Sequence, residues 1–171
     1  MVSIVHILER NGKEIVNKCY PAFSVSNRKR KFAPFPTLYW LACPETDAMV
    51  SNLERQGLIG DLELKINSDQ YELERQRFRQ QHFRYIHERN RLLYDLSLRH
   101  QLDINIEDNC VSWLHNAQRL KGIGGIDVAP LIDANSDEMH LKCLHAHYAH
   151  YLGTQDNIIG EWVHELLMRK K

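Results

Sequence analysis

Ten residues near the C-terminal end of the chain, from Lys142 to Tyr151, bring one thiol and three imidazoles together. The side chains that can do chemistry here are Cys143, His145, His147 and His150, and His140 stands just before them. In a helix, residues three, four or seven apart share a face, and that face would hold all of these side chains except His145. Such a face can bind a soft divalent metal ion or pair a thiol with a base.

A metal site is the first interpretation of this cluster. Zinc in proteins is held tetrahedrally by thiolates, imidazoles and carboxylates. Cys143, His147 and His150 have the i, i+4, i+7 spacing that lets one helical face present three ligands, and Cys43 or His140 can complete the set. We therefore predict a divalent metal ion, such as zinc, with the ligands Cys43, Cys143, His147 and His150.

Two other interpretations of the cluster stay open. In the first, Cys143 is a nucleophile activated by imidazolium and by Lys142, although a position in the middle of a helix denies it the helix dipole. The catalytic residues are then Cys143, His145 and His150, with His145 as a proton donor or acceptor. In the second, the helix is simply packed, and its histidines bond to neighbouring carboxylates and carbonyls.

A glycine-rich turn at residues 122–125 precedes the cluster. Successive backbone N–H groups in such a turn can form a concave nest for phosphate or carboxylate. The turn lacks the spacings of phosphate-binding and dinucleotide-binding loops, and a tight connection between two helices is the alternative. We predict that the anionic group of a substrate is bound by Lys142, Gly124, Gly125 and Arg28. We also expect the turn and the cluster to form two walls of one pocket.

The N-terminal region predicts a small sheet. Val2–Glu9 and Lys13–Tyr20 flank an Asn-Gly pair, which is a strong hairpin signal. The aromatic-rich segment Thr37–Ala42 suits a short buried strand. Between them, Ser24–Lys31 carries the dense basic run Arg28–Lys31, interpreted as a solvated loop or an anion-binding segment.

A long amphipathic helix is predicted from about Asp69 to Arg99, because its apolar stripe keeps helical phase and the segment contains no Gly or Pro. Arg77, Arg84 and Arg91 lie on the opposite face among acidic residues, which is typical of a solvated, self-paired surface. An RNA-binding stripe is the alternative for this face.

Shorter helices complete the fold. We predict them at Thr46–Gln56, with Thr46 as the N-cap, at Val111–Leu120, at Ser136–Gly153, with Ser136 as the N-cap, and at Ile158–Arg169. The expected architecture is a mainly α-helical α+β fold with an N-terminal β-hairpin, a short strand, a long amphipathic helix and a C-terminal helical bundle. One domain covers residues 1–171, with the hairpin and aromatic strand in residues 1–43 and the helical region in residues 44–171.

The composition describes an ordinary globular protein. Lys plus Arg equals Asp plus Glu at 22 each, so no global positive field attracts nucleic acid. Four irregularly spaced cysteines form no disulfide framework. The sequence has no secretion signal and no run of about 18 apolar residues, which favours a cytoplasmic protein with reduced thiols and no membrane contact.

Two blocks of the chain resemble a bacterial family catalogued as domain of unknown function 501. The first block is Pro34–Pro44; the second comprises Gly122–Gly125, Lys142–His147, Ala149-His150 and Asn157–Gly160. The resemblance implies a bacterial cytoplasmic setting. It emphasises Cys43, Lys142, Cys143, His145 and His150, and it implies no particular activity.

The leading hypothesis is a small cytoplasmic enzyme that uses the Cys/His cluster, around a divalent metal ion or as a thiol–base pair. Its substrate would be a small molecule that carries phosphate or carboxylate. The alternative is a non-catalytic module that binds RNA or a protein partner through the arginine face and Arg28–Lys31, with nucleic acid the less favoured ligand.

Overall fold

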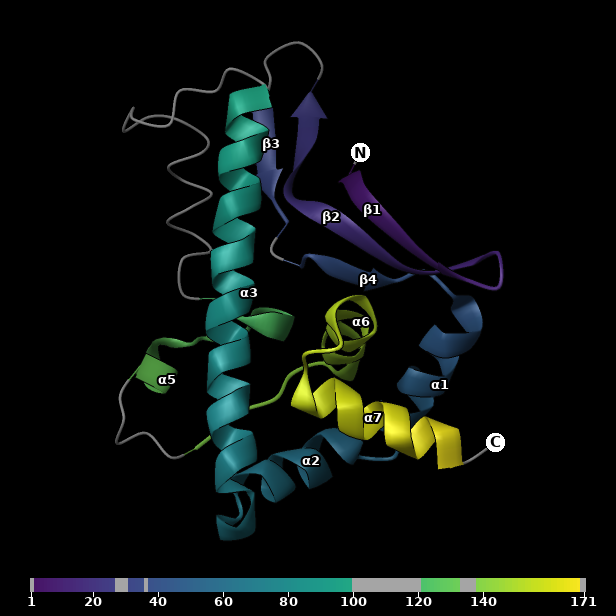
Figure 1. Ribbon diagram of the computed structural model, residues 1–171, viewed down its shortest axis with the longest axis vertical. Coiled ribbons are helices and arrows are strands. Elements are labelled where there is room, and N and C mark those ends of the chain that lie inside the picture. Colours follow the sequence, from purple (N-terminus) through teal and green to yellow (C-terminus); the bar gives the residue numbers. More distant parts are fainter. Residues whose placement is uncertain (1, 27–30, 36, 100–120, 133–137, 170–171) are drawn as a thin grey trace.

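The computed structural model describes residues 2–26, 31–35, 37–99, 121–132 and 138–169. A small antiparallel sheet and a long helix stand side by side, and shorter helices pack against both (Figure 1). The architecture is α+β and mainly helical, as predicted.

The sheet is built around one long strand. Strand β2 (Lys13–Ser26) pairs along one edge with β1 (Val2–Arg10) and along the other with β3 (Lys31–Pro34) and β4 (Tyr39–Leu41), always antiparallel. The predicted hairpin is confirmed. Asn11 and Gly12 both have positive φ, at 55° and 73°, as a two-residue hairpin turn of the primed type requires. The prediction of a loop over Ser24–Lys31 is wrong at both ends, because β2 continues to Ser26 and β3 begins at Lys31. Residues 27–30 lie outside the described residues.

Helices α1 (Pro44–Arg55) and α2 (Leu58–Asn67) follow the sheet. The predicted N-cap at Thr46 is wrong, because the helix begins at Pro44 and Cys43 is the capping residue. Proline suits the first helical position, where its fixed φ fits and its missing N–H is no loss. Gly57, at φ 86°, separates the two helices. The sequence interpretation did not include α2, although its buried Leu62 and Ile66 have the spacing of one helical face.

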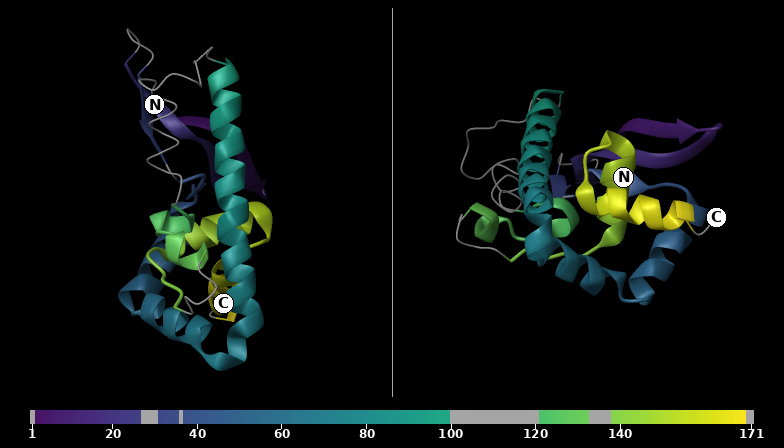
Figure 2. Two further views of the ribbon diagram at one scale, coloured as in Figure 1. Left: turned by 90° about the vertical axis from the view of Figure 1, so that its left-hand side faces the viewer. Right: turned by 60° about the horizontal axis from the view of Figure 1, so that its bottom comes forward.

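The long helix is confirmed. A 3₁₀ turn at Asp69–Tyr71 leads into α3 (Glu72–Arg99), which is continuous over 28 residues, or about 42 Å at 1.5 Å per residue. It runs along one side of the molecule (Figure 2). Its buried hydrophobic side chains belong to the predicted apolar stripe, together with His82, and Arg75, Gln81 and Arg89 are buried as well. The stripe residues buried are Phe78, Tyr85, Leu92, Leu93 and Leu96. The predicted helix at Val111–Leu120 lies outside the described residues.

The C-terminal part contains the 3₁₀ turn η2 (Ile123–Gly125), α5 (Ala129–Ile132), α6 (Leu144–Thr154) and α7 (Ile158–Arg169). The last helix has the predicted bounds. The helix of the Cys/His cluster does not: α6 begins eight residues after Ser136, and its N-cap is Cys143. The proposal that His140 and Cys143 share a helical face with His147 is therefore wrong, because both residues precede the helix.

Helix α6 lies at the centre of the molecule (Figures 1 and 2). Two groups of buried apolar side chains meet on it. One joins α6 to α1, α2, α7 and the start of α3 through Leu144 and Tyr148. The other joins it to the sheet and to the second half of α3 through Ala146 and Ala149. Among the residues described, no helix is both long enough and apolar enough to cross a membrane.

Candidate metal site

The start of α6 is held by a carboxylate of α1. The backbone N–H of Leu144 donates to Oε1 of Glu54 at 2.6 Å. Four N–H groups at a helix N-terminus have no partner within the helix, and the helix dipole favours an anion there. Glu54 therefore closes this end of α6 and lies beside Cys143.

His145 lies along α1 and has oxygen atoms at both ring nitrogens. Its Nδ1 is 3.2 Å from Oε1 of Glu54. Its Nε2 is 3.1 Å from Oγ of Ser51, 3.3 Å from the carbonyl oxygen of Asp47 and 3.6 Å from a carboxylate oxygen of the same residue. Asp47, Ser51 and Glu54 are spaced by four and three residues, so one face of α1 presents all three to the imidazole.

Glu54, Cys143 and His145 thus converge. One potential ligand atom from each residue lies within 4.8 Å of the other two, and all three side chains are half-buried. Tetrahedral zinc with ordinary bond lengths holds such atoms about 3.3–3.6 Å apart. A small inward movement of the side chains would therefore complete a three-ligand site.

The electrostatics of this cluster oppose a free thiolate. Burial raises the pKa of the Cys143 thiol, and the Glu54 carboxylate raises it further, against the N–H groups of Ala146 and His145, which lower it. The expected position in the middle of a helix was wrong, so Cys143 does have the helix N-terminus beside it. Burial and the carboxylate nonetheless raise the pKa of the thiol on balance, which disfavours Cys143 as an activated nucleophile without a nearby cation.

Cys43 is not a member of this group. It caps the N-terminus of α1, eleven residues before Glu54, which is about 16 Å along the helix axis. Cys143 lies at the other end of α1. This arrangement therefore does not support a metal ion bound by the sulfur atoms of both Cys43 and Cys143.

His147 and His150 face away from the cluster, into the core. His147 is 1% exposed and His150 is 4% exposed, and both bond to the side chain of Asn157. Neither forms a compact ligand group with Cys143 within the described part of the chain. The predicted four-ligand metal set is corrected accordingly: Cys143 stays in the candidate site with Glu54 and His145 as partners. Whether His150 acts in catalysis stays a prediction.

The protonation pattern of the buried histidines follows from two backbone N–H groups. Gly160 N–H donates to Oδ1 of Asn157 at 2.8 Å, so this atom is the amide oxygen, and Nδ1 of His147 donates to it at 3.2 Å. The amide nitrogen of Asn157 then donates to Nδ1 of His150 at 3.1 Å, which leaves the His150 proton on Nε2. Ile123 N–H likewise donates to Nδ1 of His82 at 3.0 Å and leaves that proton on Nε2.

The glycine turn packs against the candidate site. A Cβ placed on Gly124 would lie 3.8 Å from Cβ of Cys143, so turn and cluster are neighbours; the predicted pocket with these two as its walls stays a prediction. The predicted anion nest is not confirmed, because the N–H groups of Ile123 and Gly125 already donate to His82 and to the carbonyl of Gly122. The conformation explains the glycines, since φ is 70° at Gly124 and 73° at Gly125.

Lys142 and Arg28 are the remaining residues predicted to bind the anionic group of a substrate. Lys142 is exposed, and its charge stabilises the ionised carboxylate of Asp127. The pKa of Asp127 is lowered mainly by the N–H of Ala129 and also by the charges of Lys121 and Lys142. Arg28 lies outside the described residues. The side of α1 next to His145 is instead an open depression lined by Asp47, Ala48, Ser51, Glu54 and Arg55.

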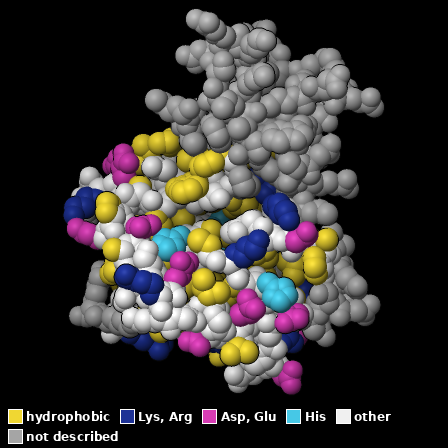
Figure 3. All heavy atoms as spheres, turned by 180° about the vertical axis from the view of Figure 1, so that it is seen from behind, with side chains coloured by type: hydrophobic (Ala, Val, Ile, Leu, Met, Phe, Trp, Pro, Cys, Tyr) yellow, Lys and Arg dark blue, Asp and Glu magenta, His cyan; other side chains and the backbone are white. Residues whose placement is uncertain are grey.

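The arginine face of α3 is largely neutralised. Arg77 pairs with Glu161, and Arg84 pairs with Asp156 through Nε at 2.8 Å. The predicted self-pairing within the helix is wrong for these two arginines, because their carboxylate partners come from the C-terminal part and not from α3 itself. Figure 3 shows a face of the molecule on which acidic, basic, histidine and hydrophobic side chains are mixed. Neither observation favours the RNA-binding alternative.

The fold and the cluster together define a mainly helical α+β protein with a mixed carboxylate, thiol and imidazole site. The chain belongs to the family described as protein of unknown function (DUF501), whose model matches residues 5–165. The resemblance seen in the two sequence blocks is thereby confirmed. No curated protein and no solved structure matches the chain.

Proposed function

We propose that this protein is a metal-dependent enzyme in which Glu54, Cys143 and His145 hold a divalent metal ion, with zinc as the best candidate. The observation that carries the proposal is the convergence of one atom from each side chain within 4.8 Å. Carboxylate, thiolate and imidazole are all established zinc ligands.

The charges of the cluster favour a cation at its centre. A thiolate at Cys143 beside the Glu54 carboxylate would place two negative charges together, and a divalent ion offsets both. His145 supports the same conclusion. The Asp47 carbonyl can only accept, so the proton belongs on Nε2, and the lone pair of Nδ1 then points at Glu54 across 3.2 Å. A metal ion removes this repulsion, and Asp47 and Ser51 orient the ring as outer ligands commonly do.

Three protein ligands and an open surface are typical of catalytic zinc sites, whereas structural zinc sites have four protein ligands. The depression along α1 gives water or a substrate access to the fourth position. A metal ion bound there supplies a Lewis acid and lowers the pKa of a bound water. Arg55 lines the depression beside Asp47 and Glu54, and its guanidinium can pair with the phosphate or carboxylate of a substrate once a metal ion offsets the two carboxylates. We propose hydrolysis of such a substrate in the bacterial cytoplasm, where the ligand thiol stays reduced.

Cobalt(II) substitution tests this function without knowledge of the substrate. We expect the Co²⁺-loaded protein to show a thiolate-to-metal absorption band that Cys143→Ser abolishes and Glu54→Gln weakens. Glu45→Gln is the matched control, because Glu45 is an exposed carboxylate at the far end of α1. Added azide should change the visible cobalt bands if the fourth position is open. Azide-insensitive bands would indicate a closed structural site, and a band that survives Cys143→Ser would reject the site itself.

A further inference from the structure

A second pocket lies on the opposite side of α6, between that helix and α3. It has a volume of about 370 Å³, which is within the usual range for small-molecule sites. Its lining combines ring and aliphatic surfaces with charged groups: Arg84, Tyr85, His87, Glu88, Arg91, His150, Thr154 and Asp156. It shares no residue with the candidate metal site.

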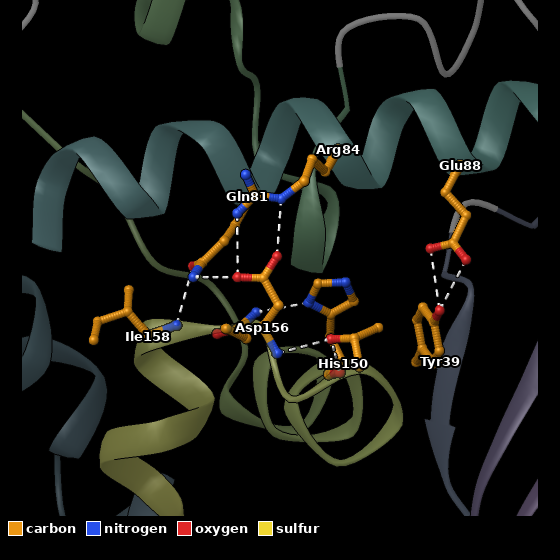
Figure 4. Close-up of polar contacts among 9 residues, drawn as sticks. Tyr39, Gln81, Arg84, Glu88, His150, Asp156 and Ile158 are labelled. Carbon is orange, nitrogen blue, oxygen red and sulfur yellow. Dashed lines mark hydrogen bonds and ion pairs between the residues drawn. The ribbon is translucent and has the colours of Figure 1, made fainter.

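The imidazole of His150 lines this pocket. His150 is 4% exposed, and its Nδ1 accepts from Asn157, so Nε2 carries the proton. Figure 4 shows the His150 ring turned toward α3, between the Arg84–Asp156 pair and the Tyr39–Glu88 pair. Among the described residues, Nε2 of His82 and Nε2 of His147 are buried without a partner, whereas Nε2 of His150 is not one of these enclosed atoms and is open to the pocket. An acceptor atom of a ligand can therefore take this N–H in place of water.

The imidazole is held as a neutral donor. Burial, together with neighbouring His147, lowers the pKa of His150 to about 3; Asp156 raises it slightly, and Arg84 and Lys18 lower it further. Tyr39 and Tyr85 pack edge-on against the ring, with centroids 5.1 Å and 5.5 Å away. Position and tautomer are therefore set by the surrounding fold before any ligand arrives.

Two arginines and two carboxylates line the pocket, and one of the arginines has no carboxylate partner among the described residues. Asp156 is paired with Arg84, and Glu88 accepts from the hydroxyl of Tyr39 and pairs with Lys18 at 2.5 Å. Arg91 is exposed, and no carboxylate in the described part of the chain pairs with it. Lys18 lies outside the lining but pairs with Glu88, so among the residues described the charge of Arg91 is the one left without a counter-charge at the pocket. A single negative charge complements this balance, whereas a dianion would meet the two carboxylates at the rim.

We propose that this pocket binds the carboxylate group of a small organic acid. One carboxylate oxygen accepts the His150 Nε2–H, and the guanidinium of Arg91 pairs with the charge. The body of the acid lies against Tyr85 and the aliphatic parts of the α3 side chains. This site is independent of the proposed metal site, since His145 and His150 leave α6 in different directions.

Calorimetric titration with benzoate tests the proposal, with benzyl alcohol as an uncharged probe of similar shape and inorganic phosphate as a second anion. Benzoate should bind in the millimolar range or tighter, and Arg91→Gln should weaken it at least about tenfold. Arg77→Gln is the matched control, because it removes an exposed arginine of the same helix outside the pocket. In parallel, benzoate should shift the ¹⁵N resonance of His150 Nε2 in the unmodified protein.

Several results would overturn the proposal. Equal benzoate affinity in the Arg91→Gln variant and the unmodified protein would exclude the charge pairing. Equal binding of benzyl alcohol would show that only the apolar body is recognised. Tighter binding of phosphate would assign another ligand class, and an unmoved His150 resonance would place the benzoate elsewhere. None of these outcomes depends on a metal ion at Glu54, Cys143 and His145.

Discussion

Mild acid should destabilise this protein strongly, because three histidines are buried as neutral imidazoles. His82, His147 and His150 are at most 4% exposed. Burial lowers the pKa of His147 to about 4 and that of His150 to about 3, and it moves the pKa of His82 well below 6.5. In the unfolded chain these groups titrate near 6.5. Below that pH the unfolded state therefore binds protons that the folded state excludes, and stability falls as pH falls.

The size of the effect follows from these shifts. At pH 5.5 each unfolded imidazole gains about 1.4 kcal/mol from protonation, and at pH 7.5 it gains less than about 0.1 kcal/mol. Three such groups remove about 4 kcal/mol between these pH values, out of roughly 5–15 kcal/mol for a typical domain. Above pH 7.5 both states hold neutral imidazoles, so this contribution is constant.

Urea unfolding followed by circular dichroism at pH 7.5 and 5.5 measures the loss. His150→Gln should reduce it by about one third, because one titrating group is removed and the glutamine oxygen can still accept from Asn157. Ile159→Val is the control: it removes a buried methylene at 0% exposure and should lower stability by the same amount at both pH values. An unfolding free energy that does not change between pH 7.5 and 5.5 would refute the reasoning, as would a full loss in His150→Gln.

Two further substitutions test the packing that positions the sites. Tyr85→Phe removes the hydroxyl that accepts the Leu38 N–H at 2.8 Å in the core, so the unfolding free energy should fall by about 1–3 kcal/mol; an unchanged urea midpoint would contradict this. Gly160→Ala would place a Cβ 2.4 Å from a carbonyl oxygen of α6 and should lower stability by about 1–3 kcal/mol in thermal unfolding. Gly60→Ala, whose Cβ meets nothing within 4 Å, should be neutral or stabilising, and equal losses in both variants would refute the close-packing argument.

The sequence was sufficient to predict those helices and turns whose formation depends mainly on their own residues. The Asn11-Gly12 turn, the uninterrupted α3 and the apolar pattern of α7 were all predicted, because turn chemistry and helical periodicity act over a few neighbouring residues. The Cys/His cluster was also recognised as the place of the candidate site, and Cys143 and His145 remain in it.

The start of α6 could not be predicted locally, because distant side chains hold the preceding segment extended. Asn67 bonds both the N–H and the C=O of Met139, and Glu63 accepts the N–H of Leu141 at 2.7 Å. These partners lie more than 70 residues earlier in the chain. The alternation of buried Met139 and Leu141 with exposed residues has the period of extended chain and was the one local signal.

Glu54 was missed for a similar reason. Its role depends on α1 lying against α6, and its spacing from Asp47 and Ser51 shows only that the three share a polar helical face. The assignment of three of the four predicted ligands, Cys143, His147 and His150, to one helix followed from the expected early start of that helix. Once Cys143 is its N-cap, the ligands come from α1 and α6 together.

The most direct test of the proposed metal site is the zinc content of untagged protein after dialysis, measured by elemental analysis. The unmodified protein should retain about one zinc ion per chain, and Glu54→Gln and Cys143→Ser should each lose most of it at unchanged secondary structure. Glu45→Gln should retain the ion. Protein that refolds fully but takes up no zinc, cobalt or other divalent ion in stoichiometric amount would contradict the account, as would full zinc retention in both ligand variants.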